Sequence, residues 1–335
     1  MGNGDNSEKS GEFELIAQIF SPLSKNYSGA FNLLDDCASY TSEPGFDLVV
    51  TKDTIVSGVH FLDDNPAASI AIKALSVNLS DIAAKGAVPK VYLLSIALPA
   101  TKSNIWLQEF AKGLSGLQSE YNIHLIGGDT VSTPGPLTIT ITIIGQVPVG
   151  QMALRSGAKS GDQVYVTGTI GDSWLGLQTF INREAFQLFS AGETDWIKDR
   201  YLHPQPRNKL ASVIRDYASA SMDISDGLLT DLQKLCKASK LGGSIYTNLV
   251  PLSPVAKKYI QHDSAGIEKL ITGGDDYELL VTVPSKVRLE FEEAASEQGV
   301  AVTKIGETSD TASLDVLDKH GEKLIITSGG YDHFC

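Results

Sequence analysis

The clearest pattern along the chain is a strict alternation at residues 137–145, where the sequence reads LTITITIIG. Leu137, Ile139, Ile141 and Ile143 fall on one side of an extended chain, and threonines occupy the other. A period of two predicts a β-strand with one apolar face, packed on helices or on a partner sheet. Less regular apolar runs predict further strands at residues 46–56, 90–99, 122–128, 163–168 and 277–284.

Between these strands, apolar residues recur at helical spacing. They predict helices at residues 12–20, 67–87, 104–122, 172–190, 206–218, 225–239 and 286–299, and Gly86 with Pro89 marks the end of the second. Residues 147–161 are rich in Gly, Pro and Ser, which is typical of a linker. We therefore expect an α/β (α+β) protein with a disordered tail at 1–10, an N-terminal domain at 11–147 and a C-terminal domain at 148–335.

Composition narrows the class of protein. The 335 residues are 42% hydrophobic and 20% charged, as in ordinary globular domains, and the formal net charge is −13. Such an excess of acid argues against non-specific binding to nucleic acid or to anionic membranes. If the protein handles phosphorylated ligands, metal cations or local basic residues must offset this charge.

The cysteines and the N-terminus point to a reducing compartment. Cys37, Cys236 and Cys335 are widely separated and form no Cys-x-x-Cys pair, so neither a disulfide framework nor a zinc site is indicated. The start is polar and lacks the apolar core of a signal peptide, and we identify no transmembrane segment. We expect a cytoplasmic protein.

Several aspartates stand next to small or apolar residues instead of on open charged faces. A buried carboxylate needs a helix N-terminus, a basic residue or a cation. Asp226 could cap a helix and Asp129 could form a turn, whereas Asp81 gains nothing obvious inside its helix. Because few Lys or Arg lie near, Mg²⁺ is the economical partner. The aspartates in question are Asp36, Asp53, Asp81, Asp129, Asp223 and Asp226.

Glycines suggest where a ligand approaches the backbone. The pair in LIGGDT (125–130) and the pair in ITGGDDYEL (271–279) each precede an acid, and such pairs permit tight turns or close approach. Gly168 and Gly171 lie between a predicted strand and a helix, where backbone N–H groups can receive an anion. Arg155 is either a phosphate clamp or a surface ion-pair partner.

Together the motifs resemble the thiamine-monophosphate kinase family, in the aminoimidazole-ribotide-synthetase-like ATP-binding superfamily. In order they are DDCA, TKDTIVSGVHF, KALSVNLSDIAAKGA, LIGGDT, RSGAKSGDQVYVTGTIGD, HPQPR, SMDISDGL and GGDDYEL, and they cover nearly the whole chain. The resemblance implies an N-terminal ferredoxin-like α/β domain that forms a homodimer through its sheets, and a larger C-terminal α/β domain. It also implies that ATP and several Mg²⁺ ions lie between the halves, and that ATP phosphorylates thiamine monophosphate to thiamine diphosphate, releasing ADP. No general base is required, because the attacking phosphate oxygen is already ionised.

The same resemblance assigns residues. The implied metal ligands are Asp36, Thr51, Lys52, Asp53, Asp81, Asp129, Asp223 and Asp226; the ATP contacts are Gly128, Asp129, Arg155 and Ser225; the acceptor contacts are His60, Asp275 and Tyr331. Two positions depart from the family. Lys52 stands where Ser or Thr is usual: a metal contact through the backbone carbonyl would tolerate it, whereas a contact that needs the hydroxyl would be lost. Asp275 stands where Glu is usual, which shortens its reach to the substrate by one methylene. A rival in the same superfamily, the hydrogenase-maturation carbamoyl dehydratase, ends in Pro-Arg-Ile-Cys, whereas this chain ends in YDHFC. A rival of another class is a non-catalytic nucleotide-binding or metal-sensing protein.

Overall fold

The computed structural model describes residues 11–182, 187–327 and 329–330. The chain forms two compact units. The N-terminal unit takes the chain as far as Pro44, together with Leu48–Asn78 and Pro89–Gln146, and the C-terminal unit takes Gly45–Asp47, Leu79–Val88 and the chain from Val147 onward. Both mix helices and strands, which confirms the predicted α+β class.

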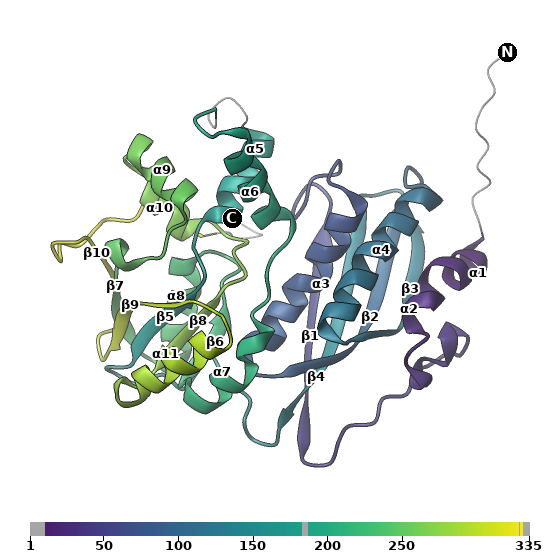
Figure 1. Cartoon of the computed structure of the whole chain (residues 1–335), viewed down its shortest axis with the longest axis horizontal. Coiled ribbons are helices and arrows are strands. Elements are labelled where there is room, and N and C mark those ends of the chain that lie inside the picture. Colours follow the sequence, from purple (N-terminus) through teal and green to yellow (C-terminus); the bar gives the residue numbers. More distant parts are fainter. Residues whose placement is uncertain (1–10, 183–186, 328, 331–335) are drawn as a thin grey trace. The chain divides into compact units, whose positions relative to one another are not determined.

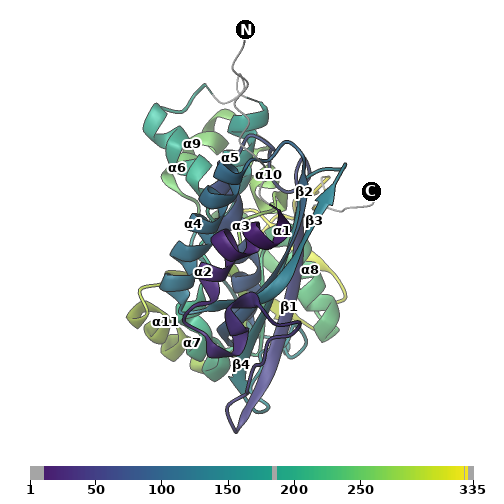
Figure 2. The same ribbon diagram turned by 90° about the vertical axis from the view of Figure 1, so that its right-hand side faces the viewer.

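The N-terminal unit is built on a four-stranded sheet in the order β1-β4-β2-β3. Helices α3 and α4 lie on one face of this sheet (Figures 1 and 2). The alternating sequence is β4, whose isoleucines Ile139, Ile141 and Ile143 are buried while its threonines are half-buried. The helices are α1 Glu12–Leu15, α2 Ser21–Ser24, α3 Ala67–Ala84 and α4 Asn104–Tyr121, and the strands are β1 Phe46–Val56, β2 Val88–Pro99, β3 His124–Thr133 and β4 Thr138–Pro148.

The C-terminal unit contains a six-stranded sheet in the order β10-β7-β9-β5-β8-β6. Its helices are α5 Asp172–Ile181, α6 Ala191–Leu202, α7 Ala211–Tyr217, α8 Leu228–Ser239, α9 Pro254–His262, α10 Gly266–Thr272 and α11 Arg288–Glu297. Its strands are β5 Gln163–Thr167, β6 Ala220–Asp223, β7 Gly242–Tyr246, β8 Leu279–Val283, β9 Val302–Ser309 and β10 Leu314–Leu317.

Alternation along the strands gives the second sheet two apolar faces. Val164 and Leu280 belong to a core cluster with the buried face of α8, whereas Tyr165 and Val281 belong to a cluster with α7 and α11. A third cluster joins α5, α6, α9 and α10. The second sheet is therefore covered on both of its faces.

Helix α3 is, among the described residues, the helix that is long and apolar enough by composition to cross a membrane. Its mean hydropathy is 1.3, and 83% of it is buried inside the protein. Burial of this extent is what the central helix of a packed domain shows.

Candidate functional site

The first Gly-Gly-Asp sequence lies inside β3 and does not form the expected turn. Gly128 pairs with Leu94 of β2, and a Cβ added to Gly128 would lie 1.8 Å from the Leu94 carbonyl oxygen. Glycine is therefore required for close packing of two strands. The next residue, Asp129, is exposed and pairs with Ser95, so this carboxylate is available to a ligand.

On β1, Thr51 and Asp53 have the same strand parity as the buried Val49 and Ile55. The Asp53 N–H donates to Oδ1 of Asn78 in α3 at 3.0 Å, which fixes this part of the strand. Lys52 is exposed, and strand alternation turns its side chain away from the Thr51–Asp53 face.

Strand order separates two of the predicted metal ligands. Asp53 lies on β1 and Asp129 on β3, which are the two outer strands of the sheet. Neighbouring strands are about 4.8 Å apart, so three steps separate these strands by roughly 14 Å. The sheet of one chain therefore does not bring Asp53 and Asp129 to a single ion.

His60 and Asp36 also belong to the N-terminal unit. Nδ1 of His60 accepts the N–H of Val56 at 3.1 Å, so a neutral ring carries its proton on Nε2. Asp36 is exposed and follows a short 3₁₀ segment, Ser28–Leu33. Tyr331 lies outside the described residues.

In the C-terminal unit, the half-buried Lys85 interacts electrostatically with three predicted site residues. Its Nζ donates to the carbonyl oxygen of Ser221 at 2.8 Å. Burial and repulsion by Arg155 lower the pKa of Lys85 to about 8, while Asp223 and Asp81 act in the opposite direction. The structure thus brings Asp81, Arg155 and Asp223 within electrostatic reach of one lysine. Sequence reasoning missed Lys85; its signal was a lysine inside the small-residue run AAKGA.

The segment between β6 and α8 presents Ser225 and Asp226. Both backbone N–H groups donate to the carboxylate of Asp231 at 2.9 Å. Asp226 forms an ion pair with Lys234, and Gly227 is the residue at the N-cap of α8. Asp226 is therefore not the helix cap that the sequence left open. Burial raises the pKa of Asp231, and Lys234 offsets this by pairing with it at 2.8 Å.

The second Gly-Gly-Asp sequence does form a loop, between α10 and β8. Asp275 has a φ of 70°, and its N–H donates to the carbonyl oxygen of Ser225 at 2.8 Å. The predicted acceptor contact Asp275 and the predicted ATP contact Ser225 therefore lie side by side within this unit.

The glycine-rich segment before α5 does not offer its N–H groups to a ligand in the way that the sequence suggested. The Gly171 N–H donates to both carboxylate oxygens of Asp276, at 3.0 and 2.9 Å. Gly168 has a φ of 56° and packs against Glu278 and Arg207. An internal acid thus occupies the helix N-terminus that was expected to bind phosphate.

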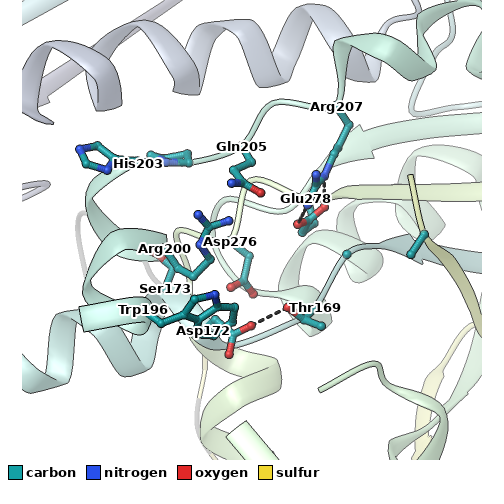
Figure 3. Close-up of a pocket in the computed structure, with 13 residues that line it drawn as sticks. Thr169, Asp172, Ser173, Trp196, Arg200, His203, Gln205, Arg207, Asp276 and Glu278 are labelled. Atoms are coloured by element: carbon teal, nitrogen blue, oxygen red, sulfur yellow. Dashed lines mark hydrogen bonds and ion pairs between the residues drawn. The ribbon is translucent and has the colours of Figure 1, made fainter. Parts of the chain in front are cut away.

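A cavity of about 240 Å³ opens beside this segment (Figure 3). Arg200 and Arg207 line it together with Asp276 and Glu278, and the Arg200 guanidinium lies over the Trp196 ring at 5.8 Å. Its thirteen lining residues include Gly168 of the predicted anion-binding segment but none of the predicted metal, ATP or acceptor contacts. Asp276 and Glu278 are nevertheless close neighbours of Asp275 in the motif GGDDYEL, in which Asp275 alone was predicted to have a role.

Within residues 11–182, 187–327 and 329–330, no group of three or more His, Cys, Asp and Glu side chains converges to hold a metal ion. The donors are nonetheless carboxylate and hydroxyl oxygens, which Mg²⁺ prefers, and Mg²⁺ is commonly held by one or two carboxylates plus substrate phosphates. The donor set is compatible with magnesium that is completed by substrate.

Family models match both halves of the chain. The model for the AIR synthase related protein N-terminal domain matches residues 34–147, and that for the AIR synthase related protein C-terminal domain matches residues 159–319.

Curated relatives match almost end to end. Thiamine-monophosphate kinase of Escherichia coli (strain K12) is 41% identical over 327 residues, which is 97% of this chain and 98% of the relative. The thiamine-monophosphate kinase of Bacillus subtilis (strain 168) is 35% identical over 326 residues, covering 96% and 99%.

Solved structures agree. Thiamine-monophosphate kinase from Stenotrophomonas maltophilia K279a has a TM-score of 0.79 and 34% identity, covering 87% of this chain and 91% of that one. AaThiL complexed with AMPPCP and TMP has a TM-score of 0.76 and 30% identity, covering 97% of both chains. The hydrogenase maturation protein HypE of E. coli has a TM-score of 0.78, covering 96% and 100%, but at 19% identity it shares only the fold.

Proposed function

The chain belongs to the thiamine-monophosphate kinase family of the AIR synthase related proteins, and we propose that it transfers the γ-phosphoryl group of ATP to thiamine monophosphate, giving thiamine diphosphate and ADP. The observation that carries this proposal is the match to curated kinases over nearly the full length of both chains. A similar structure is complexed with AMPPCP and TMP, which supports the same pair of substrates.

The transfer joins one phosphate to another. Such a reaction depends on in-line positioning and on neutralising charge more than on covalent help from the protein. We assign no general base, because the attacking phosphate oxygen is ionised at neutral pH. In the described structure, Arg155 is an exposed guanidinium suited to a phosphate oxygen, and Lys85 adds a second positive group in the same unit.

We propose that magnesium ions are held by Asp36, Thr51, Asp53, Asp81, Asp129, Asp223 and Asp226, with Lys52 contributing through its backbone. Bound magnesium supplies charge neutralisation for the phosphates of both substrates. Asp226 would exchange its present partner, Lys234, for an ion. Gly128, Asp129, Arg155 and Ser225 are the proposed ATP contacts.

The proposed acceptor contacts are His60, Asp275 and Tyr331. Thiamine monophosphate has an anionic phosphate and a cationic thiazolium ring. An N–H at Nε2 of His60 suits the phosphate, whereas a carboxylate such as Asp275 or an aromatic face such as Tyr331 suits the cation. In this proposal, His60 contacts the negatively charged phosphate of the acceptor, and Asp275 and Tyr331 contact its positively charged thiazolium ring.

We further propose a homodimer formed through the N-terminal unit, in the cytoplasm of the cell. The edge strands β1 and β3 expose apolar side chains, among them Leu48 (48% exposed), Val50 (61%) and Val131 (48%). A second copy would cover this apolar surface, and we propose that it also brings its Asp129 towards the Asp53 of its partner, because one sheet holds these two residues on opposite outer strands. The exposed apolar side chains on β1 and β3 support this assembly, and so does the separation of Asp53 from Asp129 within one sheet.

The test compares ADP release with thiamine monophosphate, thiamine and an aminoimidazole-pathway substrate as acceptors, in the presence of ATP and Mg²⁺. We expect release with thiamine monophosphate alone, and loss of release when a chelator removes Mg²⁺. Release that is triggered by another acceptor and not by thiamine monophosphate would overturn the proposed activity while leaving the fold assignment intact.

A further inference from the structure

The loop of residues 273–278 has a strained backbone. Asp275 has a φ of 70° and Tyr277 a φ of 51°, in the left-handed region that side chains other than glycine rarely adopt. Such conformations persist where the surrounding structure over-determines them, and they cluster at ligand sites. Two backbone bonds contribute here: the Asp275 N–H donates to Ser225 O and the Tyr277 N–H to Ile224 O, each at 2.8 Å.

Asp276 is one side-chain anchor of this loop. Its carboxylate accepts the Gly171 N–H at the start of α5, through both oxygens. Helix α5 has ten residues, and its N-terminus favours a negative or polar acceptor. The interaction ties the middle of the loop to a helix that is packed in a separate core cluster.

Glu278 is the second anchor, and it is buried. Arg207 Nε donates to one of its oxygens at 2.7 Å, and the second Arg207 nitrogen, Nη2, donates to the other. The Thr167 hydroxyl donates to Glu278 at 2.5 Å and itself accepts the Leu279 N–H at 2.8 Å. Paired contacts of this kind fix the direction as well as the position of a side chain.

The two anchors and the two strained residues alternate along the loop. Asp276 and Glu278 line the cavity of Figure 3, whereas Asp275 and Tyr277 do not. Instead, the Tyr277 hydroxyl donates to Oδ1 of Asp275 at 3.3 Å. Asp276 and Glu278 therefore anchor the loop, whereas the Tyr277 hydroxyl donates a hydrogen bond to the Asp275 carboxylate.

We propose that Asp276 and Glu278 are positioning residues that hold Asp275 in its acceptor-binding conformation, and that the Tyr277 hydroxyl orients its carboxylate. This inference rests on the proposed function, because it deepens the role given to Asp275. In the hydrogen bonds described above, neither anchor side chain bonds to a proposed ATP contact, and the loop reaches Ser225 only through the backbone bond from the Asp275 N–H to the Ser225 carbonyl oxygen. We therefore expect the anchors to affect binding of the cationic acceptor much more than binding of ATP.

The test measures KM for thiamine monophosphate and for ATP separately in Glu278→Gln, Asp276→Ala, Asp276→Asn and Tyr277→Phe. We expect Glu278→Gln and Asp276→Ala to raise KM for the acceptor roughly tenfold, which is the lower end of the effect of removing a residue that supports a ligand contact. KM for ATP should stay within about twofold of the wild-type value. Asp276→Asn keeps an acceptor oxygen for Gly171 and should be milder than Asp276→Ala. Tyr277→Phe keeps both anchors and should raise only the acceptor KM.

The matched control is Asp162→Asn. Asp162 is also a buried carboxylate of this unit, where it accepts the Ser219 hydroxyl at 2.6 Å and the Lys159 N–H at 2.8 Å, and it contacts no part of the loop through these bonds. A purely structural effect would lower the melting temperature and the active fraction in both Asp162→Asn and Glu278→Gln. It would not raise KM for thiamine monophosphate more than KM for ATP.

Three outcomes have distinct meanings. An unchanged acceptor KM in folded Glu278→Gln and Asp276→Ala overturns the inference. If those variants do not fold, an unchanged acceptor KM in Tyr277→Phe and Asp276→Asn overturns it instead. ADP release by the wild-type protein with thiamine monophosphate is measured first. If the wild type releases no ADP with this acceptor, the proposed function has failed.

Discussion

Asp276 is an acid whose charge the fold disfavours. Burial raises its pKa well above the ordinary value of 3.8, the Gly171 and Ser173 N–H groups oppose this only in part, and Asp172 and Glu278 raise it further. The folded state therefore holds this proton more tightly than the unfolded chain does. Stability from this group is present at low pH and is lost as the pH rises through the unfolded value towards the folded one.

We accordingly predict that Asp276→Asn, which cannot ionise, changes the pH dependence of stability. The free energy of unfolding of the wild type relative to Asp276→Asn should fall as the pH rises above about 4, by at most about 1.4 kcal/mol per pH unit. Urea unfolding at several pH values in that range measures it. Curves that stay parallel for the two proteins would show that Asp276 is not held protonated by the fold.

At the scale of elements, sequence reasoning succeeded where one pattern dominated. The 137–145 alternation lies within β4, and the helix expected at 67–87 is α3, Ala67–Ala84. It did not find α6, because Ala191–Leu202 has weak apolar periodicity and is held by packing on α5. Sequence reasoning also placed the first Gly-Gly-Asp in a turn and not inside a strand. Glycine is needed there because the Leu94 backbone approaches Gly128 closely, and the local sequence pattern does not contain that contact. Lys85 and the anchors of the 273–278 loop were missed for the same reason: their partners are far away in the sequence.

Two glycines offer a matched test of that close approach. Gly128 in β3 would place a Cβ against the Leu94 backbone, whereas a Cβ on Gly116, inside α4, would meet nothing within 4 Å. We predict that Gly128→Ala lowers the free energy of unfolding by about 1–3 kcal/mol, as overpacking does. Gly116→Ala should raise it by roughly 0.5–1 kcal/mol, because alanine is the better helix former. Urea unfolding measures both, and equal effects at the two sites would contradict the packing argument.

At the scale of the whole molecule, the sequence predicted a set of site residues, and the strand order limits how these residues can meet. The metal and ATP residues were assigned by resemblance, residue by residue, and strand order then set a constraint that the resemblance did not state. Asp53 and Asp129 lie on opposite outer strands of one sheet. If both serve the same ions, each site must take one of them from each of two chains, and the proposed dimer is then a requirement of the chemistry.

This requirement predicts complementation between two inactive proteins. Asp53→Asn and Asp129→Asn should each fold and dimerise, and each should lose at least about 100-fold in kcat, because a metal ligand is missing. When the two are mixed and allowed to exchange subunits, a heterodimer has one site with both carboxylates intact and one with neither. Random exchange makes about half of the dimers mixed, so about a quarter of the wild-type activity should return. If native mass analysis shows mixed dimers but no activity returns, both carboxylates act within one chain or on different ions, and a monomeric mass by light scattering would remove the basis for sharing altogether.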